Sequence, residues 1–267
     1  MFRTEHFFSI LGRLVLCVGA AVVLVSCAAV DSPLSPRGPQ RRIYLGPTVA
    51  LGINGVGGTF HSQSPNGSDC NGFTGGSSVG FGAGLAMEYW FAQSLVSNGI
   101  VARIMYQQMP STFTNDYGSV PFWNPQLQKA ESVRETHDAT VDYSLINIRL
   151  AYLYSIPATA FGLEIGPSIG IASGLNIKQT LKIDEAVSPG VTFADGTTSQ
   201  EIYNGSPTTK NGIRFGLWVG GQYKFDVGWW IISPYVGYDI GFTKVLSTDS
   251  WSVSSIVAGL DFKYGIK

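Results

Sequence analysis

Hydrophobic and polar residues alternate along most of the chain after residue 42. Between Phe161 and Ile177, large apolar residues occupy nearly every odd position, whereas small or polar residues occupy the even positions. The segments 213–225 and 256–266 show the same period of two. Because successive side chains of a β-strand point to opposite faces, this period indicates strands rather than helices. The pattern therefore predicts an all-β chain.

Eight segments show this alternation, and each is long enough for the ~9–11 tilted residues of a membrane-spanning strand. They cover residues 43–54, 78–91, 98–108, 140–156, 160–177, 211–226, 230–245 and 252–266. Short connections alternate with long polar loops at 55–77, 109–139 and 178–210, and a brief link covers 246–251. Short turns on one side and long loops on the other are typical of antiparallel up-and-down transmembrane β-barrels. An even strand number puts both ends of the barrel on the short-turn side, the periplasmic side.

Composition indicates which face meets lipid. Charged residues make up 13% of the chain, about half of the ~25% usual in soluble domains. The polar face of the strands is mostly Gly, Ser and Ala, which is too poor in charge to form a water-facing exterior. We therefore expect the large apolar side chains to face lipid and the small and polar ones to fill a narrow lumen. A soluble eight-stranded barrel would have the opposite arrangement.

Aromatic residues cluster near the ends of the segments, as in the interfacial belts of membrane proteins. On the short-turn side they are Tyr89, Phe91, Tyr152, Tyr154, Phe161, Tyr223, Phe225, Trp229, Trp230 and Tyr264. On the loop side, a second belt is expected from Tyr106, Phe215, Phe242 and Trp251. The two belts would mark the two membrane surfaces.

The lumen is where chemistry inside a barrel would take place, and the alternation directs nine charged side chains into it. They are Glu88, Arg103, Arg149, Glu164, Arg214, Lys224, Asp239, Asp261 and Lys263. We expect two pairs between neighbouring strands, Glu88 with Arg103 and Arg149 with Glu164. Since an unpaired buried charge costs several kcal/mol, a salt-bridge plug is one interpretation; a gate or selectivity ring of a narrow pore is the other.

The N-terminal residues 1–26 have the order of a secretory signal peptide, with Arg3 and Arg13 before an apolar stretch. The stretch ends in Leu24-Val25-Ser26-Cys27, which resembles the lipobox of bacterial lipoproteins. That resemblance implies cleavage before Cys27 and its lipidation; ordinary cleavage after Ala28 or Ala29 is the alternative. Residues 27–42 then form a periplasmic tether, and residues 43–267 form the barrel.

Residues 43–267 resemble the small eight-stranded outer-membrane β-barrel proteins, the family that includes the transmembrane domain of outer membrane protein A. The resemblance is carried by the alternation and by pieces such as Leu45-Gly46-Pro47, Ile165-Gly166-Pro167-Ser168-Ile169-Gly170 and Ser233-Pro234-Tyr235-Val236-Gly237. It implies insertion in the bacterial outer membrane and brings no catalytic signature. Because proline cannot donate to a strand ladder, Pro47, Pro167 and Pro234 predict bulges or ladder gaps.

Several chemistries find no support. Ser168 lies in a G-x-S-x-G sequence, but the alternation continues through it without a strand-to-helix elbow. The three cysteines cannot form a disulfide framework or a four-thiolate zinc site, and His61 and His137 lie in loops without ligand spacing. A net charge of −1 gives no basic field for nucleic acid. The sequence therefore predicts no catalytic residue, metal or cofactor and no nucleic-acid partner.

Three function classes remain. The first is a non-enzymatic membrane-embedded structural or surface-interaction protein with a plugged lumen, surrounded by outer-membrane lipid. It would contact an extracellular partner through the loops 55–77, 109–139 and 178–210. The second is a narrow porin-like channel or transporter for small solutes, which the glycine-rich inner face favours. The third is a lipid-acting barrel enzyme, for which no residue set is evident.

Overall fold

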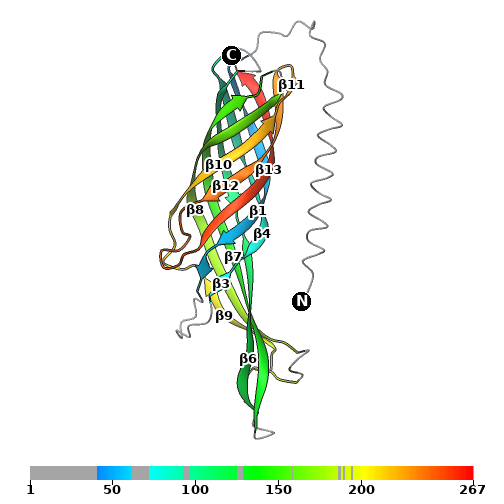
Figure 1. Cartoon of the computed structure of the whole chain (residues 1–267), viewed down its shortest axis with the longest axis vertical. Helices are drawn as coiled ribbons and strands as arrows, with labels where there is room; N and C mark the ends of the chain where they lie inside the picture. The colour runs from blue at the N-terminus through cyan, green and yellow to red at the C-terminus, as the bar shows by residue number, and fades with distance from the viewer. Residues whose placement is uncertain are drawn as a thin grey trace. The chain divides into compact units, whose positions relative to one another are not determined.

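The computed structural model describes residues 41–61, 72–92, 97–124, 129–157, 159–185, 188, 190–193 and 195–266, and the side chains of 116–131 are not described. The described residues form thirteen strands (Figure 1). They are β1 (Ile43–Gly57), β2 (Thr59–Phe60), β3 (Phe73–Thr74), β4 (Ser77–Trp90), β5 (Gly99–Gln108), β6 (Ser111–Asn124), β7 (Lys129–Ser155), β8 (Phe161–Ile183), β9 (Ser199–Gly205), β10 (Ile213–Tyr223), β11 (Phe225–Val227), β12 (Trp230–Gly241) and β13 (Ser252–Ile266). Among the described residues, no helix is long and apolar enough to cross a membrane. The predicted signal peptide, the tether to residue 40, Cys27 and Cys70 lie outside the described residues.

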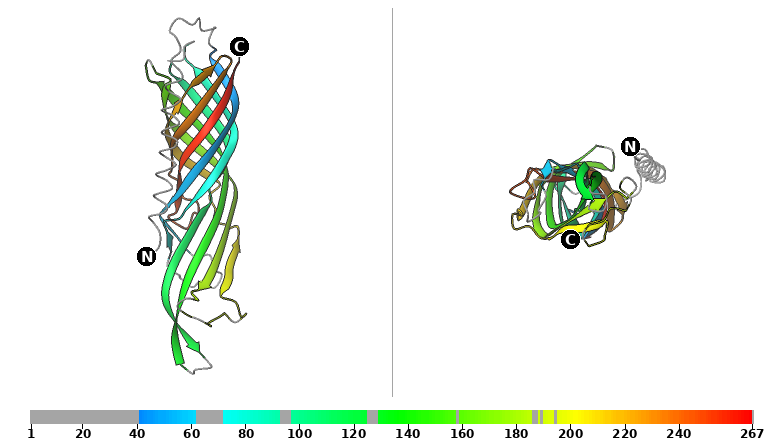
Figure 2. Two further views of the ribbon diagram at one scale, coloured as in Figure 1. Left: turned by 90° about the vertical axis from the view of Figure 1, so that its right-hand side faces the viewer. Right: turned by 90° about the horizontal axis from the view of Figure 1, so that it is seen from below.

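Eight of the strands close into a ring. Following the antiparallel pairings, the ring runs β1–β4–β5–β7–β8–β10–β12–β13 and returns to β1 (Figure 2). The closing pair joins Ile43 to Ile266, so both ends of the barrel lie on the side of the short turns. Each of the eight predicted segments overlaps one of these strands, and β1, β4, β7 and β8 extend beyond the predicted bounds. The predicted fold class, an eight-stranded antiparallel barrel, is confirmed.

The three strand prolines lie at gaps in the ladder, as predicted. Pro47 pairs with Leu85 on one side, but the pairing of β1 with β13 skips it. Pro167 pairs with β10 and is skipped on the side of β7, and Pro234 pairs with β13 and is skipped on the side of β10. Pairing resumes in the same register after each gap. The missing N–H of proline therefore costs the ladder a bond without displacing the strands.

Glycine precedes two of these prolines because the neighbouring backbone comes very close there. A Cβ atom added at Gly166 would lie 2.0 Å from the backbone oxygen of Leu150, which cannot move away without shifting β7. We expect Gly166→Ala to lower the free energy of unfolding by about 1–3 kcal/mol, measured by urea titration in lipid vesicles. Gly55→Ala is the matched control, since a Cβ at Gly55 meets nothing within 4 Å. Equal stability of the two variants would contradict the close approach.

The distribution of side chains around the ring matches the expected membrane orientation. Large apolar residues of every ring strand are exposed on the outside, such as Leu51 at 64%, Leu163 at 53% and Ile256 at 54%. The inward positions are buried and carry polar, charged and small residues. An exterior of this kind is stable against acyl chains and would be unfavourable in water. The outer wall of the ring is therefore the lipid-facing surface.

Most of the predicted aromatic positions form belts. On the short-turn side the rings contact one another in pairs and triplets, including Phe91 with Tyr152 and Trp229 with Tyr264. On the loop side, Tyr106, Phe215 and Phe242 are exposed. The assignment of Trp251 to that belt is wrong. Its side chain is fully buried, because the link before β13 folds inward over the open end of the barrel instead of crossing the outer wall.

Four strands continue beyond the ring on the loop side and form a projecting sheet in the order β6–β7–β8–β9 (Figures 1 and 2). β6 pairs with the first half of β7, and β9 pairs with the end of β8. The expectation that 109–139 is a surface loop is therefore wrong: most of it is a β-hairpin. The loop 178–210 likewise contains the end of β8 and all of β9. We call this four-stranded part the outer sheet.

Candidate functional site

All nine charged side chains predicted to face the lumen are buried inside the barrel, with exposed fractions of 5% or less. Seven of the eight ring strands contribute one or two of them, and Lys224 lies between β10 and β11. They form three groups along the barrel, described below from the short-turn end to the loop end. Buried charges are stable only when they are paired and hydrogen-bonded, and each group meets this requirement with its own partners.

Glu88 is the centre of the first group. Its carboxylate binds the ammonium groups of Lys224, at 3.1 Å, and of Lys263. The indole nitrogen of Trp90 donates a hydrogen bond to the same carboxylate, at 2.6 Å. Trp90 also packs on Tyr44, with ring centroids 4.9 Å apart. The short-turn end of the lumen is therefore occupied by an ion triad under an aromatic pair.

Arg103 is the centre of the second group. Its guanidinium donates two hydrogen bonds to Glu164, at 2.6 and 2.9 Å, and binds Asp261 at 3.0 Å. The same guanidinium lies 4.0 Å from the centroid of the Tyr235 ring. The indole of Trp218 donates to Glu164 at 2.7 Å. Both carboxylates thus receive several charge-assisted hydrogen bonds, the strongest kind in proteins.

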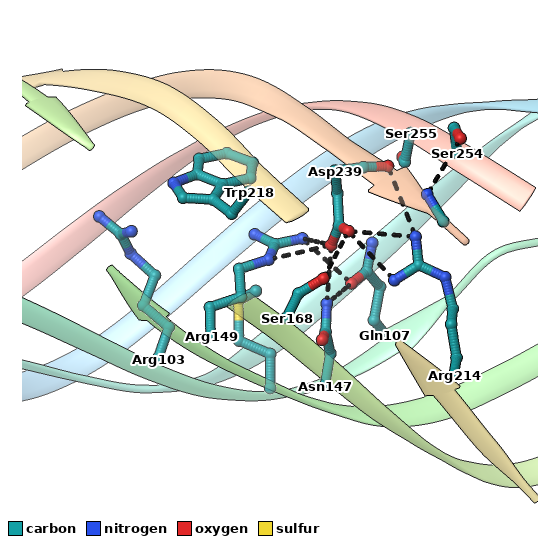
Figure 3. Close-up of polar contacts among 12 residues, drawn as sticks. Arg103, Gln107, Asn147, Arg149, Ser168, Arg214, Trp218, Asp239, Ser254 and Ser255 are labelled. Atoms are coloured by element: carbon teal, nitrogen blue, oxygen red, sulfur yellow. Dashed lines mark hydrogen bonds and ion pairs between the residues drawn. The ribbon is translucent and has the colours of Figure 1, made fainter. Parts of the chain in front are cut away.

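Asp239 is the centre of the third group, which Figure 3 shows with its partners from several strands. One carboxylate oxygen accepts from Arg149 at 3.0 Å, and the other accepts from Arg214 at 3.1 Å and Ser168 at 2.8 Å. The amide of Asn147 donates to the first oxygen at 3.1 Å. One carboxylate therefore pairs with two guanidinium groups, so this group keeps a formal net charge of +1.

The two ion pairs expected between neighbouring strands are wrong. Arg103 lies in β5 but binds carboxylates of β8 and β13, across the lumen, and Arg149 binds Asp239 of β12 instead of Glu164. Glu88 binds two lysines rather than Arg103. Long side chains of a narrow barrel reach the far wall, so the partner is set by height along the barrel axis and not by strand adjacency.

Large side chains fill the space between the charged groups. Trp218 and Tyr235 are buried in mid-lumen, with ring centroids 6.2 Å apart. Glycines make room for them: a Cβ at Gly237 would lie 2.6 Å from the Trp218 ring, and one at Gly259 would lie 2.4 Å from the Tyr235 ring. The inward glycines therefore accommodate aromatic rings and do not leave an open pore at this level.

An apolar cluster fills the loop end of the barrel, which we call the outer plug. Phe60, Phe73, Phe113 and Trp251 pack ring against ring, with centroids 5.2 to 6.1 Å apart. The remaining members are Met109, Ala139, Val141, Tyr143, Leu145, Leu175, Ile177, Val245, Leu246 and Val253. Sequence reasoning missed this cluster because half of it comes from segments that were expected to be loops.

Uncharged polar side chains complete the network and were also missed. Gln107 accepts from Asn147 at 2.8 Å, and Gln222 donates to Glu88 at 3.3 Å. Both glutamines are inward positions of predicted strands, so the alternation that selected the charges could have found them. The amide of Gln222 links the Glu88 and Arg103 groups, because Arg103 also donates to it at 3.5 Å. Gln107 bonds only within the Asp239 group, to Asn147 and Arg149.

The other candidate residues do not form a site. Ser168 is a buried residue within β8, and its hydroxyl donates to Asp239. His61 binds Asp249 at 2.7 Å on the loop side, whereas His137 lies in β7 and packs edge-on against Phe73; burial lowers the pKa of His137 below its usual value. In the described part of the chain, no three His, Cys, Asp or Glu side chains are placed to hold a metal ion.

Comparisons with known proteins give remote likenesses. No protein-family model and no curated protein matches the chain. Among solved structures, Neisserial surface protein A is similar at 11% identity and a TM-score of 0.34, over 84% of this chain and 97% of that one. The attachment invasion locus protein Ail of Yersinia pestis is similar at 11% identity and a TM-score of 0.32, over 84% and 99%. The outer membrane protease OmpT of Escherichia coli is similar at 9% identity and a TM-score of 0.29, over 89% and 99%.

Because these scores are low, the fold is assigned from the geometry of the chain itself. The ring of eight antiparallel strands is closed, so it leaves no edge with unpaired backbone groups for a bilayer to cover. The outer wall is apolar with aromatic belts, and the inner face is polar. By this combination, the chain has the fold of the small eight-stranded outer-membrane β-barrel proteins.

Proposed function

We propose that the chain is a non-enzymatic surface-interaction protein of the bacterial outer membrane. The barrel anchors it in lipid with both termini in the periplasm, and the outer sheet and neighbouring loops face an extracellular partner. The filled lumen acts as a structural core. A narrow porin-like channel remains the alternative function, and nucleic acid, metals and cofactors have no part in either.

The observation that carries this proposal is the contrast between the filled lumen and the projecting outer sheet. The lumen is occupied along its length by three charged groups, by Trp218 and Tyr235, and by the outer plug. The outer sheet, in contrast, consists of β6, β9 and the extensions of β7 and β8, and these parts lie beyond the ring. Its outward positions are exposed and polar, among them Thr140, Asn176 and Lys178. Ordered, polar and projecting strands are suited to recognition.

A planar-bilayer recording tests the closed lumen. We expect the refolded barrel, inserted in a bilayer, to show no discrete current steps, because side chains occupy the narrow lumen along its length. Steps of reproducible size would support the channel instead. In that case neutralising Arg103 or Glu164 should change the conductance, whereas neutralising the exposed Glu201 should not.

A trimmed hairpin tests the role of the outer sheet. Residues 117–135 can be replaced by a two-residue turn, because Asp116 and Thr136 form a ladder pair that the turn can close. We expect cells that display the trimmed barrel to lose adhesion to a panel of immobilised proteins and polysaccharides, while the amount of heat-modifiable barrel stays the same. Undiminished adhesion by trimmed barrels, and by barrels lacking 55–77 or 178–210, would contradict the proposal.

A further inference from the structure

A polar pocket of about 110 Å³ lies in the wall of the barrel unit, where β5 ends. Its lining residues are Gln108, Pro110, Asp142, Tyr143 and Ser144. Tyr143 is buried and points inward, whereas Asp142 is exposed and the other three are partly exposed. The polar groups of Gln108, Asp142 and Ser144 therefore face the outside of the wall and not the lumen.

The pocket exists because two irregularities meet on β7. On one edge, Gln108 at the end of β5 pairs with Ser144, and after Pro110 the ladder resumes at Ser111 of β6. On the other edge, the pairing of β7 with β8 shifts register and skips Ser173. Bulges re-aim side chains and are frequent beside binding sites. Here the break at proline opens the wall, and the bulge directs a serine toward it.

The donors and acceptors at the opening are held by one another. The hydroxyl of Ser173 lies 3.2 Å from that of Ser144, and the phenol of Tyr106 hydrogen-bonds the side chains of Ser144 and Gln108. Asp142 makes no ion pair with any described residue. The pocket thus presents a carboxylate, hydroxyls and an amide, without a cation.

The position of the pocket relative to the membrane limits what can enter it. Two residues along the ladder toward the membrane, Tyr106 pairs with Ile146, and these two side chains are 44% and 43% exposed on the outer wall. Tyr106 belongs to the loop-side aromatic belt, which marks the boundary of the acyl chains. On the other side of the pocket, the outer sheet begins with exposed Thr140 and Asn176. The opening therefore lies at the level of lipid headgroups.

We propose that this pocket binds the sugar ring of a glycolipid headgroup in the outer leaflet. A carboxylate can accept from two neighbouring sugar hydroxyls, while the serine hydroxyls and the glutamine amide can donate or accept at the ring edge. The negative charge of Asp142 would repel a phosphate group. This inference rests on the proposed orientation, with the loop side outward, and adds a lipid ligand to the surface-interaction role.

Native mass spectrometry of the full mature chain in lipid nanodiscs tests the pocket. The discs contain phosphatidylcholine with a minor fraction of monoglucosyl diacylglycerol, and the readout is the glucolipid that stays bound after release from the disc. We expect Asp142→Ala and Ser144→Ala each to lower its retention about fivefold to tenfold, the effect of one or two hydrogen bonds. Thr140→Ala, an exposed position two residues along the same strand, is the control and should retain as much as the native chain.

Two further arms identify the ligand. If Asp142→Asn lowers the retention of phosphatidylethanolamine but not that of the glucolipid, the pocket binds an ammonium group and the inference is wrong. If methyl glucoside binds in discs without glucolipid and shows the same dependence on Asp142 and Ser144, the sugar site stands and its source is a soluble glycan. Equal glucolipid retention in all variants overturns the site. If retention is equal in all pocket variants but cells with the trimmed hairpin lose adhesion, the glycolipid site is wrong and the proposed surface-interaction function still stands.

Discussion

Replacing Arg103 by Met is expected to destabilise the barrel by about 3–5 kcal/mol, because it leaves two buried carboxylates with too few partners. Glu164 would keep only the indole of Trp218 and Asp261 would keep only the more distant ammonium of Lys263, at 3.4 Å, among their strong donors. Methionine has a similar length and fills the space, so the effect reports the lost charge more than a cavity. Urea titration in short-chain lipid vesicles measures the free energy of unfolding.

The control for this prediction is an ion pair of the same chain that lies in water. Lys178 and Glu201 are 2.9 Å apart in the outer sheet, with side chains 53% and 44% exposed. Glu201→Ala should change the free energy of unfolding by no more than about 1 kcal/mol, as is usual for exposed pairs. Adding Glu164→Gln to Arg103→Met should recover part of the loss, since it removes one uncompensated charge. A loss below about 1 kcal/mol for Arg103→Met would mean that the network does not stabilise the barrel.

The sequence predicts which residues face the lumen but not which of them pair. The alternation with a period of two determines which side chains face the lumen. A shift of the strand register by one residue would place every apolar side chain inside. Pairing across the lumen depends on strand tilt and stagger, which determine the height of each residue along the barrel axis. Glu88 and Arg103 are near one another in sequence across a short turn, yet Glu88 binds Lys224 and Lys263. Nothing in the local pattern encodes those heights.

Most of the outer sheet was predicted as loops for a related reason. The segment 109–139 contains charged residues such as Arg134 and Asp138, which are excluded from the lipid-facing wall of a barrel. Beyond the membrane that restriction ends, and strands can carry charges on their outward face. Asp138 accordingly pairs with Lys182 of β8, at 2.7 Å. The alternation of Thr112, Phe113 and Thr114 at the start of β6 is a local sign of a strand.

The second large effect is expected at Trp251. As a residue of the outer plug it contacts Phe60 at 5.2 Å and Phe113 at 6.1 Å between ring centroids, and its side chain is fully buried. Truncation of a buried tryptophan typically costs about 3–5 kcal/mol. We expect Trp251→Ala to reach this range and to increase hydrogen exchange in β2 and β3, which dock on the plug. The part of the ring on the short-turn side should stay protected from exchange.

Phe242 provides the matched control, because it is an aromatic residue of the loop-side belt with an exposed fraction of 64%. Truncating a ring that contacts lipid leaves no internal cavity, so Phe242→Ala should cost much less than Trp251→Ala. Brominated lipids separate the two positions independently: they should quench the fluorescence of Trp229 and Trp230 in the short-turn belt and leave that of Trp251 unquenched. Suppose that the two variants lose equal free energy of unfolding and that brominated lipid quenches Trp251. Trp251 would then belong to the loop-side belt, as the sequence pattern predicts, and the outer plug would not close the lumen.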